Sequence, residues 1–164
     1  MLTIEIALRH AAGELATFQP RLRDAVARTL ELHGVTSAEL SVAMVGSEEM
    51  QRLNRESLGH DYPTDALSFL FARGEEGLSG EIILDYDTAR RQAAEYGWPA
   101  ESELLLYAVH ATLHLVGYDD DTEADRAAMR QAERRILAEF GLEPPWDLKH
   151  ESRSPKSETN PNIK

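Results

Sequence analysis

The chain has 164 residues, no cysteine and a formal net charge of −12 at pH 7. The length fits one domain, and the lack of cysteine excludes disulfides, thiolate zinc sites, iron–sulfur clusters and cysteine nucleophiles. The acidic balance disfavours indiscriminate attraction to nucleic acid. No segment resembles an export signal or has the roughly 20 apolar residues of a membrane span, so we expect a cytoplasmic protein.

The first third of the chain predicts alternating strands and helices. Residues 2–8 alternate apolar and polar side chains, which indicates a strand with one buried face. Pro20 suits the first turn of a helix that stops near Gly34, and residues 40–44 repeat the strand alternation. Ser47, followed by two glutamates, predicts the start of a short helix.

The middle of the chain predicts a hairpin and a helix. The segments ALSFLF (66–71) and EIIL (81–84) have strand-like composition and a glycine-rich connection, so we expect them to pair antiparallel. A helix follows over residues 87–97, with Asp87 as its expected cap and Gly97 as its end.

Two more helices are expected before the C-terminus. Pro99 opens the first, and Gly117 can end it. Thr122 and Asp125 resemble the capping pair of the second, which ends at Gly141. The mixture of elements predicts an α+β fold with about four strands in a mixed sheet and about five helices.

The C-terminal stretch differs from the rest. Residues 144–164 are polar and lack periodicity, so we expect a disordered tail after a single domain over residues 1–143. Arginines in the last expected helix alternate with Glu133 and Glu139, which we interpret as a solvent-exposed face. These arginines are Arg126, Arg130, Arg134 and Arg135.

The stretch HATLHLVGYDD (110–120) has the spacing of a zinc-ligand set. On a helix, His110 and His114 lie one turn apart and project from the same side. The leucines around them predict a core helix, and Gly117 lets the following loop reverse so that Asp119 or Asp120 completes three ligands. The alternative is two hydrogen-bonded core histidines, because histidine pairs at this spacing also arise by chance.

Three protein ligands leave a coordination position for water, which is typical of catalytic rather than structural zinc sites. In zinc peptidases with an HExxH motif, a glutamate beside the first histidine is the general base. Ala111 occupies that place here and cannot accept a proton, so peptidase chemistry is disfavoured.

Several stretches together resemble the YbeY family, bacterial metal-dependent endoribonucleases of ribosomal RNA maturation. Residues 110–120 are similar to the family motif HGxLHLxGYDH, PTDALSF (63–69) to PTDVLSF, and SGEIIL (79–84) to a GDIxI strand. The resemblance runs in order through most of residues 40–140. It implies one bound divalent ion, which we expect to be zinc. The resemblance assigns His110, His114 and Asp120 as its ligands and places Thr64 and Asp65 near the site.

The resemblance also implies a function. It predicts a single-strand-specific endoribonuclease that matures the 3′ end of small-subunit ribosomal RNA and takes part in ribosome quality control. His110 and His114 would act in catalysis through the metal. The expected partners are ribosomal RNA and the small ribosomal subunit, with no membrane, and the sequence predicts no oligomeric state.

This chain departs from the family pattern at three positions. The family usually has histidine in place of Asp120 and glycine in place of Ala111. Aspartate is an acceptable zinc ligand, but a harder donor. The family arginine thought to face the RNA phosphate is Leu58 here, and we consider Arg55 and His60 as candidates to replace it.

Two other functions fit the sequence. A non-catalytic ribosome-assembly factor with a structural metal agrees with the missing arginine and the acidic body. Hydrolysis of a small phosphoester or amide also agrees, because metal-bound water attacks many substrates. Near the motif, we expect Tyr118 to pack, and Asp119 either to orient a ligand imidazole or to cap the next helix.

Overall fold

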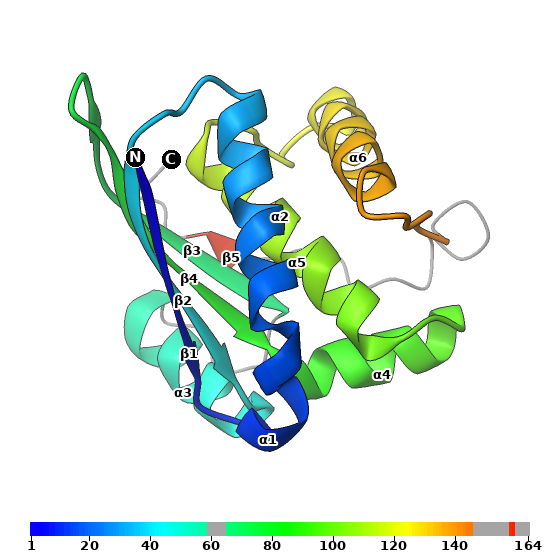
Figure 1. Cartoon of the computed structure of the whole chain (residues 1–164). Helices are drawn as coiled ribbons and strands as arrows, with labels where there is room; N and C mark the ends of the chain where they lie inside the picture. Colours follow the sequence, from blue (N-terminus) through cyan, green and yellow to red (C-terminus); the bar gives the residue numbers. More distant parts are fainter. Residues whose placement is uncertain (59–64, 146–157, 160–164) are drawn as a thin grey trace.

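The computed structural model describes residues 1–58, 65–145 and 158–159, and shows one mixed sheet with helices on both faces (Figure 1). The strands lie in the order β1-β2-β4-β3-β5. β1, β2 and β4 are mutually parallel, and β3 pairs antiparallel with β4. Their bounds are β1 Leu2–Leu8, β2 Ala38–Val45, β3 Ala66–Gly74, β4 Gly77–Asp85 and the two-residue β5 Glu158–Thr159.

Five helices of eleven or more residues are present in the described part of the chain, preceded by two short turns of helix. Their bounds are α2 Gln19–Leu32, α3 Ser47–Leu58, α4 Tyr86–Tyr96, α5 Ala100–Leu115 and α6 Glu123–Ala138. The short ones are α1 Ala12–Leu15 and the 3-10 helix η1 Ala16–Phe18. The α+β class and the five long helices predicted from the sequence are therefore confirmed, whereas α1 and η1 were not predicted.

The alternation of side chains along the strands divides the core into two layers. On β2, Leu40 and Val42 join a large cluster with α2 and α5, while Ala43 and Val45 face the other way. There they pack against Met50 of α3. α3 thus covers the face of the sheet opposite α5, as Figure 1 shows.

α5 is the central helix of the larger layer. It contacts β3, β4, α2, α4 and α6, and nearly all its residues are buried. Pro99 is its N-cap in extended conformation, and Gly117 follows its end with φ 110°. Such a positive φ suits glycine, which lets the chain reverse directly after the helix.

Most predicted boundaries are confirmed, with one correction. Asp85 rather than Asp87 caps α4, because its carboxylate accepts a hydrogen bond from the Thr88 amide. Asp87 instead accepts hydrogen bonds from the Ser47 amide at the start of α3 and from His10. The two acids therefore fix the start of two helices.

The structure describes only a small part of the C-terminal stretch. The predicted disordered tail lies mostly outside the described residues, and within it Glu158–Thr159 pairs in parallel with Leu67 and Ser68 of β3.

None of the helices described here has both the length and the apolar character needed to cross a bilayer.

The β3–β4 hairpin provides a test of the close backbone packing. A Cβ on Gly80 would lie 2.6 Å from the Phe69 carbonyl oxygen, whereas a Cβ on Gly74 would meet nothing within 4 Å. We expect Gly80→Ala to lower the free energy of unfolding by about 1–3 kcal/mol, and Gly74→Ala to change it by less than about 0.5 kcal/mol. Urea unfolding of both variants measures this, and equal stability of the two would contradict it.

Candidate metal centre

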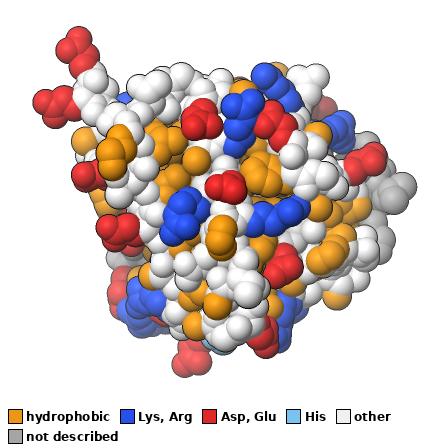
Figure 2. Space-filling model, viewed as in Figure 1, with side chains coloured by type: hydrophobic (Ala, Val, Ile, Leu, Met, Phe, Trp, Pro, Cys, Tyr) orange, Lys and Arg blue, Asp and Glu red, His pale blue; other side chains and the backbone are white. Residues whose placement is uncertain are grey.

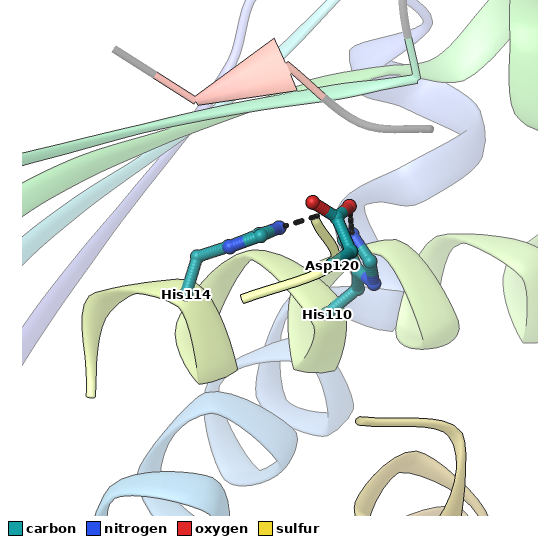
Figure 3. A group of neighbouring side chains, drawn as sticks. All are labelled: His110, His114 and Asp120. Atoms are coloured by element: carbon teal, nitrogen blue, oxygen red, sulfur yellow. Dashed lines mark ion pairs between the residues drawn. The ribbon is translucent and has the colours of Figure 1, made fainter. Parts of the chain in front are cut away.

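Two histidines of α5 and one aspartate from the following loop converge in the structure (Figure 3). The Nε2 atoms of His110 and His114 lie 3.9 and 3.6 Å from Oδ2 of Asp120. One ligand atom from each residue lies within 4.8 Å of the other two. The sequence prediction that these residues come together is therefore confirmed by the geometry.

The loop that carries Asp120 is held at both ends. At its start, the Gly117 amide donates to the His114 carbonyl, and the Tyr118 amide to the Leu113 carbonyl. At its end, Thr122 caps α6, and Arg126 donates to the carbonyl oxygen of Asp120. These contacts bring Asp120 back over the histidine face of α5.

Both imidazoles are oriented through their Nδ1 atoms. His114 Nδ1 lies 3.0 Å from the Tyr118 carbonyl oxygen, which can only accept, so Nδ1 carries the proton. His110 Nδ1 lies 2.5 Å from Oε2 of Glu133 on α6. In the neutral form of each ring, Nε2 then carries a lone pair, and both Nε2 atoms are buried without a hydrogen-bond partner among the described residues.

This arrangement fits a divalent cation. Two lone pairs and a carboxylate directed at one another repel unless a positive charge lies among them. Zinc bonds of about 2.1 Å to nitrogen and oxygen place tetrahedral ligand atoms about 3.4 Å apart, close to the 3.6 and 3.9 Å between Asp120 Oδ2 and the two Nε2 atoms. Two histidines and one carboxylate are also a common ligand set of catalytic zinc sites.

The charges around His110 make its ring easier to protonate than an ordinary imidazole. Burial lowers the pKa of His110, but the charge and hydrogen bond of Glu133, with smaller effects of Asp65 and Asp120, outweigh it. The pKa is therefore raised above its ordinary value of 6.5. Asp65 itself is buried directly before β3, and its Oδ1 has no hydrogen-bond partner in the part of the chain that the structure describes.

The residues that orient the two imidazoles were not predicted from the sequence. Glu133 was interpreted as part of an exposed helix face, which is wrong, because it is buried and bonded to His110. The four arginines around it are exposed, as predicted. The hint in the sequence is the spacing of Glu133, four residues after the buried Met129 and three before the buried Ile136, which places it on the apolar side.

Tyr118 connects the centre to α2. Its side chain packs against the core, as expected, and its hydroxyl lies 3.0 Å from Nε2 of His33. Thr122 rather than Asp119 caps α6, and the Nδ1 atoms of the two ligand imidazoles bond to Glu133 and to the Tyr118 carbonyl. His33, which the sequence left without a role, thus holds the residue whose carbonyl orients His114.

Of the two candidate RNA contacts, Arg55 and His60, the structure describes only Arg55. Arg55 lies on α3 and lines a depression that also contains Arg9, His10 and Arg52, and none of the three ligands lines it. His60 and Thr64 lie outside the described residues, as does the side chain of Leu58. A role for Arg55 or His60 in catalysis therefore stays a prediction.

The fold and this centre define an α+β protein with a candidate metal site built on a buried helix and the loop after it. A model of the family described as Endoribonuclease YbeY matches residues 6–141. The chain belongs to this family, whose name is that of a nuclease.

Individual relatives agree. Endoribonuclease YbeY of Chloroherpeton thalassium is 38% identical over 120 residues, covering 73% of this chain and 84% of the relative. That of Geobacter metallireducens is 38% identical over 144 residues, covering 84% and 95%. The solution structure of TM1509 from Thermotoga maritima matches with a TM-score of 0.53 at 23% identity, over 96% of this chain and all of the other, which supports the fold.

We expect the purified protein to contain about one divalent ion per chain. His114→Ala should lower this content, because it removes one of three donors. His10→Ala, which alters an exposed histidine bonded to Asp87, is the matched control and should leave the content unchanged. Elemental analysis after non-chelating purification measures this, and a metal-free wild type would contradict it.

Metal affinity should depend on pH through His110. The ion needs the Nε2 lone pair, and below the pKa of His110 a proton occupies it, so each further pH unit costs about tenfold in affinity. Because that pKa is raised, the loss should begin at a higher pH than for an ordinary histidine. Zinc titrations from about pH 8 to about pH 5 test this; a constant affinity down to pH 6 would oppose it.

Proposed function

We propose that this protein is a metal-dependent, single-strand-specific endoribonuclease that acts in the cytoplasm on ribosomal RNA, at the 3′ end of the small-subunit RNA, and in ribosome quality control. The observation that carries the proposal is the convergence of His110, His114 and Asp120 in a chain of the YbeY family. Zinc is the proposed ion, because the donor set matches its preferences.

The chain contributes orientation and charge. A bound divalent ion supplies Lewis acidity and lowers the pKa of coordinated water. His110 and His114 present their Nε2 atoms in one fixed direction, and Asp120 adds a negative charge. Ala111 is buried beside His110 and offers no proton acceptor, which separates this chain from the zinc peptidases.

The substrate must meet a protein of mostly negative charge. On the face seen in Figure 2, arginine side chains are interspersed with acidic ones, so this face presents no continuous positive surface. Selective contacts would then hold the RNA, and Arg55 and His60 are our candidates for them. Ribosomal RNA and the small subunit are the proposed partners.

A non-catalytic ribosome-assembly factor is the second candidate. The net charge of −12 and Leu58 in place of the family arginine favour it, since a nuclease needs positive charge against the phosphates. In that case the ion would stabilise the fold, and RNA would bind without being cut.

Cleavage of precursor ribosomal RNA separates the two candidates. We expect the zinc-loaded wild type to cut it and His110→Ala to cut at least about 100-fold more slowly, because the metal supplies several kcal/mol of transition-state stabilisation. Chelation should stop the reaction and added zinc should restore it. Equal cleavage by both proteins, or cleavage by neither, would favour the assembly factor.

A further inference from the structure

Glu133 is a buried carboxylate with a single described hydrogen bond. It lies on α6, is 4% exposed, and places Oε2 2.5 Å from His110 Nδ1. Burying a carboxylate is costly unless a strong donor compensates it. The short contact with a ring N–H of His110 provides that compensation.

Glu139 is a nearby glutamate with a structural role only, and it serves as a comparison for Glu133. Glu139, just after α6, is exposed and pairs with Arg28 of α2 at 2.6 Å. That pair joins two helices and touches nothing at the candidate metal centre. Glu133 instead turns away from the exposed arginines of α6 and toward α5.

We propose that Glu133 is a positioning residue for the metal centre, acting through His110. Its carboxylate accepts a hydrogen bond from Nδ1–H, which fixes the ring tautomer and plane, and its negative charge makes Nε2 a stronger electron-pair donor toward a divalent ion. This inference rests on the metal site of the proposed function. It adds a residue outside the ligand set.

The two imidazoles are thereby made unequal. His110 is backed by a full negative charge, whereas His114 is backed by the neutral carbonyl of Tyr118. Glu133, together with Asp120 and the buried Asp65, supplies negative charge that stabilises a divalent cation in a buried place. Removing the charge of Glu133 should therefore weaken binding of the ion even if the ligands stay where they are.

Zinc affinity of the full chain tests the proposal. Glu133→Gln keeps the size and an acceptor oxygen but removes the charge, and we expect the dissociation constant for Zn²⁺ to rise roughly 10- to 100-fold. Glu139→Gln is the matched control and should stay within about twofold of the wild type. Competition with a chromophoric chelator measures both, and an unchanged affinity for Glu133→Gln would overturn the proposal.

Double variants separate positioning from general destabilisation. Adding Glu133→Gln to His114→Ala should weaken zinc binding by the full factor, whereas adding it to His110→Ala should weaken it clearly less, because only the direct effect of the charge on the ion then remains. An equal loss in both backgrounds would show a structural role and overturn the proposal.

A second measurement needs no variant. In the zinc-loaded wild type, the Nδ1 proton of His110 should resonate further downfield than that of His114, because a carboxylate is the stronger acceptor. Coordination of zinc through Nδ1 of His110 would overturn the proposal. Zinc binding without RNA cleavage would refute only the nuclease, and a wild type that binds no zinc would refute both.

Discussion

The structure depends on one electrostatic constraint: two imidazole lone pairs and a carboxylate are directed at the same small buried volume. Each group is held there from behind, by Glu133, by the Tyr118 carbonyl or by the loop after Gly117. A folded chain keeps such mutual repulsion only when a proton or a metal cation relieves it. The fold can therefore be understood as a scaffold for charge compensation at one end of α5.

The rigidity of that scaffold comes from the burial of α5. The helix lies between the sheet and α2, α4 and α6, so its apolar residues pack on nearly every side. Densely packed side chains have few alternative rotamers. His110 and His114 therefore belong to the least mobile part of the core, and Asp120, on a loop, is the ligand with the greater freedom.

How much the sequence predicted depends on whether a feature is local. Periodicity and caps identified the strands, the long helices and the spacing of His110 and His114, because these follow from neighbours in the chain. Glu133 lies 23 residues from His110, and Tyr118 reaches His33 across 85 residues, so only the packing of helices reveals these contacts. The cap of α4 was misplaced by two residues because Asp85 and Asp87 are both good capping residues, and only tertiary contacts assign them.

α6 contacts the candidate metal centre at two places. Arg126 in its first turn donates a hydrogen bond to the loop of Asp120, and Glu133 in its third turn bonds to His110. Ion occupancy and the docking of this helix onto α5 are then thermodynamically linked. A cation that binds only the docked form shifts the equilibrium against local unfolding of α6, by an amount that grows with the free ion concentration. Through this coupling, the availability of the ion in the cell would set how long the C-terminal part of the domain stays protected from proteases.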